Sequence, residues 1–186
     1  HTALPEILEY TKSKGIENSI VSNGVNWSDH LIEVAVKTCR WIGISVDSAT
    51  SGTYEVGRNK DSFLDTISNV QKIANKIKEL KRNCDLAYKF LIFEYNQHEV
   101  CRACQLAKGL GVNDFHARPA DLSHQGMDKS YKGKAKAYDV DYVIKQFDKC
   151  HDLETEDFRV FTIVHKFDEN FCPARNFTQC YASPCC

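Results

Sequence analysis

The feature that most constrains this chain is the regular alternation of short apolar runs with longer segments of helical periodicity. The clearest helical segment begins at Asp61 or Ser62. Its apolar side chains recur every three or four residues and are Phe63, Ile67, Val70, Ile73, Ala74, Ile77 and Leu80. Short strands that alternate with helices of about ten or more residues are typical of parallel βαβ units. The sequence therefore predicts an α/β protein with a parallel sheet.

The expected elements follow one another in a simple order. Strands are expected at residues 18–22, 41–47, 86–94, 112–118 and 158–166, and helices at 4–14, from residue 29, and at 61–80, 97–110 and 140–150. The polar segment 121–136 is expected to be a long loop. We expect the first four strands to lie side by side, in chain order, in one curved sheet. Periodicity alone is compatible with both a doubly wound open sheet and a partial barrel.

Charge and hydropathy exclude several classes of protein. The net charge of −1 over 186 residues gives no basic footprint for nucleic acid or for an anionic membrane surface. No apolar run approaches the length of a membrane span, and the first residues have neither the basic start nor the apolar stretch of a secretory signal. We therefore expect a cytoplasmic protein with no nucleic-acid or membrane partner.

The nine cysteines do not read as a disulfide scaffold, because their number is odd and no secretory signal accompanies them. Cys101 and Cys104 form a CxxC pair, but they fall inside the predicted helix 97–110 without a second pair at zinc-site spacing, so we expect buried helix thiols. His98 is expected to be a cap or surface residue. Four further cysteines are close together near the end of the chain: Cys172, Cys180, Cys185 and Cys186. Such a segment suits a soft metal or an iron–sulfur cluster, and a zinc module is the alternative.

Ligands of parallel α/β folds bind at the carboxyl ends of the strands, so the strand ends are the candidate site. The strand 41–47 has two different faces, with Ile42, Ile44 and Val46 on one and Gly43, Ser45 and Asp47 on the other. We expect the apolar face to meet helices and the small polar face to line a cavity, with Gly43 leaving room for a ligand near the backbone. In the alternative interpretation, Asp47 caps the turn that follows the strand.

The strand 112–118 has a similar pattern. Asp114, His116 and Arg118 share one of its faces. An arginine at a strand end suits a carboxylate or phosphate ligand, because its guanidinium is planar and always charged. The alternative is an ion pair between Arg118 and a neighbouring carboxylate.

The residues from Ile42 to Ser48, followed by Tyr54, Arg58 and Phe63, resemble those of radical S-adenosylmethionine enzymes. Members of that family often have a strand that ends in Ser-x-Asp, then a loop with a Tyr and an Arg, then a helix that begins near an aromatic residue. Three other segments support this resemblance. Ser22-Asn23-Gly24 is similar to the family's Thr-Asn-Gly turn, Asn96 to Glu99 to its Asn-x-x-Glu helix start, and Arg118-Pro119 to its strand-end arginine.

The tail resembles the auxiliary-cluster extension known as SPASM. The residues from Phe177 to Pro184 look like its entry, although here Pro184 runs directly into Cys185 and Cys186 without the usual hairpin. The CxxxCxxC motif that defines the family, and its Gly-Gly-Glu-Pro strand end, do not occur in this sequence. The resemblance implies that both lie upstream of His1.

The resemblance implies a partial (β/α)₆ TIM-like barrel with a short cysteine-rich C-terminal extension. Residues 1–120 would form the barrel without its first strands, 121–170 its end and a linker, and 171–186 the start of the SPASM-like segment. It also implies an enzyme that uses a [4Fe–4S] cluster, with ligands outside this chain, to cleave S-adenosylmethionine and abstract a hydrogen atom from a small-molecule or peptide substrate. Its electron donor would be a protein such as flavodoxin or ferredoxin.

The implied site residues fall into two groups. The cofactor or substrate would contact Ser22, Asn23, Ser45, Asp47, Asn96 and Arg118. An auxiliary [4Fe–4S] cluster would be bound by Cys180 with Cys185 or Cys186. The alternative is a non-catalytic barrel that binds a nucleoside or a partner protein.

Overall fold

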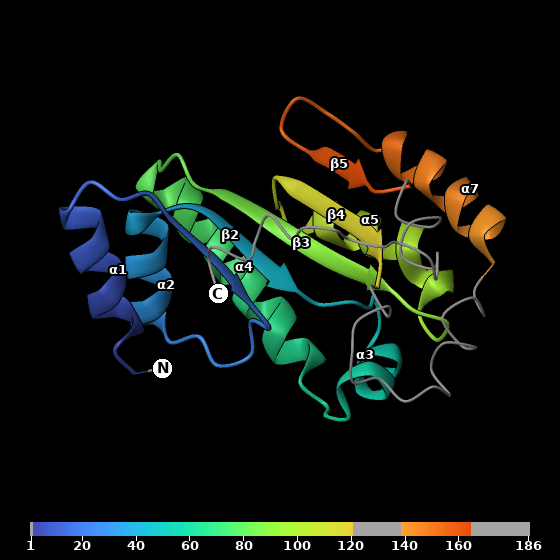
Figure 1. Ribbon diagram of the computed structural model, residues 1–186, viewed down its shortest axis with the longest axis horizontal. Coiled ribbons are helices and arrows are strands. Elements are labelled where there is room, and N and C mark those ends of the chain that lie inside the picture. Colours follow the sequence, from blue (N-terminus) through green and yellow to red (C-terminus); the bar gives the residue numbers. More distant parts are fainter. Residues whose placement is uncertain (1, 121–138, 165–186) are drawn as a thin grey trace, which may run out of the picture.

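The computed structural model describes residues 2–120 and 139–164 (Figure 1). Its elements are α1 (Leu4–Ser13), β1 (Asn18–Ser22), α2 (Asp29–Thr38), β2 (Cys39–Ser45), α3 (Ser51–Arg58), α4 (Phe63–Leu80), β3 (Asp85–Ile92), η1 (Gln97–Glu99), α5 (Val100–Gly109), β4 (Asp114–Pro119), α7 (Val140–His151) and β5 (Arg159–Thr162). The predicted alternation of strands and helices is confirmed.

The strands form one five-stranded parallel sheet in the order β1-β2-β3-β4-β5. Each strand therefore pairs with the next strand along the chain, as predicted. A doubly wound sheet has a point at which the strand order reverses, and the described strands contain none. The sheet is that of a partial β/α barrel, which decides between the two architectures that periodicity left open.

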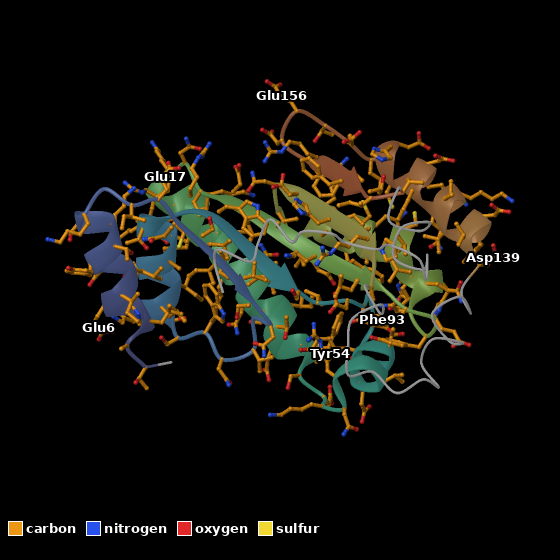
Figure 2. All side chains as sticks on the ribbon, in the orientation of Figure 1. Glu6, Glu17, Tyr54, Phe93, Asp139 and Glu156 are labelled. Atoms are coloured by element: carbon orange, nitrogen blue, oxygen red, sulfur yellow. The ribbon has the colours of Figure 1, made fainter. Side chains whose placement is uncertain are left out.

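Helices cover one face of this sheet. α2 packs on β2, α5 on β3 and β4, and α7 on β5 (Figure 1). The strand side chains that meet these helices are apolar and almost completely buried, and they include Ile42, Ile44, Leu86, Tyr88, Phe90, Phe115 and Val160. Burying one such side chain stabilises the fold by about 1.5–3 kcal/mol. The core of the protein therefore lies between the sheet and its helices, where side chains fill the space (Figure 2).

Helix α3 was not predicted, and the segment that the family resemblance treats as a loop is helical from Ser51 to Arg58. The helix begins where the Thr50 hydroxyl accepts a hydrogen bond from the backbone N–H of Thr53 (3.3 Å). It has no apolar stripe, and Tyr54 is its one buried residue. A helix with a single buried side chain leaves no periodic signal in the sequence.

The boundaries of β2, β3, β4 and β5 also differ from those predicted. β2 ends at Ser45 rather than at residue 47, because Asp47 takes a left-handed conformation (φ 60°) that strand geometry does not allow. β4 begins at Asp114 and includes Pro119, which pairs with Ile92.

The described cysteines, Cys39, Cys84, Cys101, Cys104 and Cys150, are free thiols. Cys104 is buried within α5 and Cys101 is half-buried there, close to what the sequence predicted. The predicted cluster ligands Cys180, Cys185 and Cys186 lie outside the described residues, as do the predicted loop 121–136 and the last residues, 165–170, of the predicted barrel end and linker. None of the described helices is long and apolar enough to cross a membrane.

Candidate functional site

The second face of the sheet is polar and partly open. Ser45, Lys89, His116 and Phe161 occupy successive strands in register and form one row across this face. Leu91 and Arg118 are paired one level nearer the carboxyl ends of the strands. Ser45, Lys89, Leu91 and His116 are half-buried, whereas Arg118 and Phe161 are exposed. Side chains on this face are therefore accessible to a ligand, unlike their immediate neighbours on the covered face.

The indole of Trp41 lies across Gly43 on the open face. A Cβ atom at Gly43 would be 2.3 Å from Cη2 of Trp41 and 2.9 Å from Cδ of Lys89. The Trp41 ring also has the Lys89 ammonium 5.6 Å from its centroid, and its Nε1 donates a hydrogen bond to Oδ2 of Asp114 (3.3 Å). Gly43 does permit a close approach to the backbone, but the group that uses the space is Trp41 and not a ligand.

His116 stands between two aromatic rings. Its ring centroid is 5.8 Å from that of Trp41 and 4.7 Å from that of Phe161, which it meets edge-on. Its Nε2 is buried, has no hydrogen-bond partner among the described residues, and lies 3.9 Å from Oδ2 of Asp114. Burial lowers the pKa of His116; Asp114 opposes this shift, and Lys89, Arg159 and Arg118 add to it. The neutral imidazole is therefore favoured.

Asp47 and Asn96 join the ends of β2 and β3. Oδ1 of Asp47 accepts a hydrogen bond from the backbone N–H of Leu91 (2.7 Å), and its Oδ2 accepts one from the guanidinium of Arg58 (2.5 Å). The Asn96 amide donates to the carbonyls of Asp47 and Leu91 (both 2.8 Å) and accepts from the N–H of Phe93 (2.7 Å). Burial raises the pKa of Asp47, although the Leu91 N–H and the charge of Arg58 oppose that shift.

Glu99 fastens the start of α3 to η1. Its buried carboxylate accepts hydrogen bonds from the N–H of Ala49 (2.7 Å) and the hydroxyl of Thr50 (2.6 Å). The hydroxyl of Tyr88 donates to the carbonyl of Ser48 in the same loop (2.5 Å). These contacts connect residues about fifty positions apart, so the sequence alone gave no sign of them. They fix the loop that carries Asp47.

The predicted site residues thus have different surroundings. The hydroxyl of Ser22 accepts hydrogen bonds from the N–H of Gly24 and from Nε1 of Trp27 (both 3.1 Å), and the side chain of Asn23 accepts one from Val25 N–H (3.2 Å). Within residues 2–120 and 139–164, the Ser45 hydroxyl makes no hydrogen bond and Arg118 pairs with no carboxylate. The ion pair considered for Arg118 is therefore not observed in that part of the chain.

Two residues of the open face, Lys89 and Trp41, were not predicted from the sequence. The signal was available for Lys89, since it is the one charged residue within the apolar run from Leu86 to Ile92. His98 is exposed in η1, as predicted. Within the described ranges, no group of three or more His, Cys, Asp or Glu side chains could hold a metal ion.

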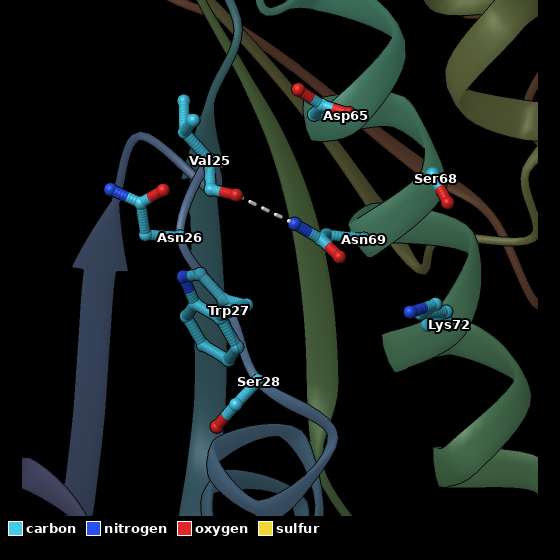
Figure 3. Close-up of a pocket in the computed structure, with 8 residues that line it drawn as sticks. All are labelled: Val25, Asn26, Trp27, Ser28, Asp65, Ser68, Asn69 and Lys72. Carbon is cyan, nitrogen blue, oxygen red and sulfur yellow. Dashed lines mark hydrogen bonds between the residues drawn. The ribbon is translucent and has the colours of Figure 1, made fainter.

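A groove of about 490 Å³ lies elsewhere, between α4 and the loop before α2 (Figure 3). Trp27, Asp65, Asn69 and Lys72 are among its lining residues. The Asn69 amide donates hydrogen bonds to the carbonyls of Gly24 and Val25 (2.9 and 3.0 Å) and so fastens this loop to α4. The groove therefore lies at a junction between the loop and the helix layer, and it is separate from the row on the open face.

No protein-family model matches the sequence, and no curated protein matches it. Solved structures do match the fold. A domain of pyruvate-formate lyase-activating enzyme from Bacteroides vulgatus superposes with a TM-score of 0.57 and 11% identity over 87% of this chain and 90% of that domain. Streptococcus suis SuiB superposes with a TM-score of 0.61 and 11% identity over 86% of this chain. The chain has the fold of these proteins.

SuiB is a longer protein, and this chain spans 35% of it. Other structures of SuiB are bound to the precursor peptide SuiA and to S-adenosylmethionine, with TM-scores of 0.60 and 0.58 and 12% identity to this chain. At such identity the likeness is one of fold. It agrees with the resemblance that the motifs around Asp47 indicated.

Proposed function

We propose that this chain is part of a radical S-adenosylmethionine enzyme and that its open sheet face forms a wall of the cofactor and substrate site. The observation that carries the proposal is the polar row from Ser45 to Phe161 on the open face of a sequentially ordered parallel sheet. The likeness in fold to SuiB, which has been solved with S-adenosylmethionine, supports the same conclusion.

The residues at the strand ends fit the polar parts of S-adenosylmethionine. The Ser45 hydroxyl makes no hydrogen bond to any described residue, and it can donate one to or accept one from a ribose diol. Each Asp47 oxygen accepts one hydrogen bond and can accept a second. The Arg118 guanidinium would contact the cofactor or the substrate, and Ser22 and Asn23 would contact the cofactor from the end of β1.

Asn96 is proposed to support the cofactor site indirectly. Because it is fully buried and already makes three hydrogen bonds, we propose that it acts by holding Asp47 in place. A direct contact between Asn96 and the cofactor stays a prediction.

S-adenosylmethionine and a [4Fe–4S] cluster together supply the radical chemistry of the family. The described residues do not provide a ligand set for that cluster. Because the CxxxCxxC motif does not occur in this sequence, we propose that the ligands of that cluster lie outside this chain, and that an auxiliary cluster is bound by Cys180 with Cys185 or Cys186. The described residues would bind and orient S-adenosylmethionine and the substrate, and would exclude water from the site.

The substrate and partners are proposed by analogy. The structure of SuiB with its precursor peptide makes a peptide a reasonable substrate class, beside small metabolites. An electron donor such as flavodoxin or ferredoxin, and a cytoplasmic location, complete the proposal.

Calorimetric titration of the full-length, anaerobically reconstituted protein tests it. S-adenosylmethionine should bind, Ser45→Ala should weaken binding about tenfold, and Ser68→Ala, at an exposed position on α4, should leave it unchanged. Iron and sulfide analysis of the same sample should show a cluster. Absence of iron, together with equal affinity for adenosine and S-adenosylmethionine, would instead indicate a nucleoside-binding barrel.

A further inference from the structure

Two cations on the open face have no carboxylate partner among the described residues. Lys89 and Arg118 lie on adjacent strands, one register level apart. Burial and the charge of Arg118 both lower the pKa of Lys89, and the charge of Asp47 opposes them. Two like charges close together, one of them half-buried, favour the binding of an anion.

The carboxylates nearby are already engaged. Asp114 accepts a hydrogen bond from Nε of Arg159 (2.7 Å), and Asp85 accepts one from Nη2 of the same residue (3.1 Å). Asp47 is held by Arg58 and by the N–H of Leu91. None of these three carboxylates forms an ion pair with Lys89 or Arg118, although Asp47 is close enough to affect Lys89 electrostatically.

The same region carries apolar surface. Phe161 is 44% exposed and packs edge-on against His116, whose other side faces the indole of Trp41. The Nε2 of His116 is buried and has no hydrogen-bond partner among the described residues, and Oδ2 of Asp114 lies 3.9 Å from it, so this ring offers the ligand its aromatic surface. A ligand that matches this surface has an anionic group next to an apolar or aromatic part.

We infer that Lys89 and Arg118 bind a carboxylate of the substrate, and that Trp41, His116 and Phe161 contact the apolar part next to it. The inference rests on the proposed function in one respect, which is that the ligand is the substrate. The methionine carboxylate of S-adenosylmethionine is the other possible source of the same chemistry.

Phenylacetate is a suitable probe because it joins a carboxylate to an aromatic ring, and 2-phenylethanol is its uncharged counterpart. Binding to the full-length protein would be followed by calorimetry and by the NMR signals of the His116 ring. Phenylacetate should bind and 2-phenylethanol should bind at least about tenfold more weakly. Lys89→Met and Arg118→Leu should each weaken phenylacetate binding about tenfold.

The controls separate charge from folding. Lys89→Arg and Arg118→Lys keep the charge and should retain binding within about threefold. Lys72→Gln removes an exposed cation from α4 and should have no effect. Equal binding of phenylacetate by the wild type, Lys89→Met and Arg118→Leu would overturn the inference.

Repeating the titration with saturating S-adenosylmethionine distinguishes the two carboxylate sources. Unchanged phenylacetate affinity supports a substrate site. Competitive displacement, with both variants losing S-adenosylmethionine affinity, would assign the row to the cofactor and overturn the inference. If S-adenosylmethionine does not bind at all but the row still binds phenylacetate, the proposed function fails and the anion site stands.

Discussion

The two faces of the sheet are built from alternate residues of the same strands, yet they have different chemistry. On β3, Tyr88 and Phe90 are buried under helices, whereas Lys89 and Leu91 face the open side. The covered face contributes stability through burial and close packing. Within residues 2–120 and 139–164, the open face has a hydroxyl without a hydrogen bond, an imidazole nitrogen without a hydrogen-bond partner, and two cations without carboxylate partners. This contrast indicates that the covered face maintains the fold and that the open face binds ligands.

The largest expected effect on stability is the difference between truncating a phenylalanine on the covered face and truncating one on the open face. Phe115 is fully buried against Tyr88 and Phe90, so Phe115→Ala should lower the free energy of unfolding by about 3–5 kcal/mol. Phe161 is 44% exposed, so Phe161→Ala should cost less than about 1 kcal/mol. Urea denaturation measures both. Similar losses for the two variants would show that the open face is a second core.

The next largest loss of stability is expected from a substitution at the junction between the ends of β2 and β3. Asn96→Ala leaves the carbonyls of Asp47 and Leu91 and the N–H of Phe93 without their partner, and it should lower the free energy of unfolding by about 2–4 kcal/mol. Asn75→Ala, at an exposed position on α4, is the matched control and should cost less than about 0.5 kcal/mol. An Asn96 variant as stable as the Asn75 variant would contradict the role assigned to Asn96.

Asp47 connects stability with binding. Asp47→Ala should weaken S-adenosylmethionine binding by about 1.5–3 kcal/mol, and Asp47→Asn should cost less because the amide oxygen still accepts a hydrogen bond. Calorimetry gives the affinities, at a temperature where circular dichroism shows all three proteins folded. Equal affinity in the wild type and both variants would remove Asp47 from the site.

The smallest effect concerns the titration of His116. Its pKa should lie below 6.5, and Lys89→Met or Arg118→Leu should raise it, because each removes a charge that disfavours the imidazolium. NMR titration of the ring protons measures the shift, with Lys72→Gln as the control. A pKa above 6.5 in the wild type would contradict the burial of this ring.

The same shift has a consequence for stability. The folded state binds the His116 proton less tightly than the unfolded state does. The neutral His116 ring therefore contributes to the free energy of unfolding above pH 6.5, and this contribution is lost as the pH falls through the folded-state pKa. In His116→Gln, the free energy of unfolding, measured by urea denaturation at several pH values, should decrease less on acidification than in the wild type. The same pH dependence in the variant and the wild type would contradict this contribution of His116.

Much of the fold was predictable because it depends on local periodicity. The stripe from Phe63 to Leu80 and the alternation of Ile42, Ile44 and Val46 with small polar residues both reflect one buried face, and both are confirmed. Helix α3 was missed because Tyr54 alone is buried in it. The order of the strands followed from the βαβ pattern.

The candidate site was less predictable, because its geometry depends on contacts between distant segments. The sequence indicated the polarity of Ser45, Asp47 and Arg118. It could not indicate that Arg58 and Leu91 hold the Asp47 carboxylate, or that Trp41 covers Gly43. Such contacts depend on the register of neighbouring strands and on rotamers.

The central claim is that ligands meet the open face and not the covered one, and methyl NMR tests it most directly. Val21 and Leu91 carry methyl groups on the open face, and Ile42 and Ile92 are fully buried on the covered face. Addition of S-adenosylmethionine to the methyl-labelled full-length protein should shift the signals of Val21, Leu91 or both and leave those of Ile42 and Ile92 in place. Shifts confined to Ile42 and Ile92 would contradict the assignment of the two faces.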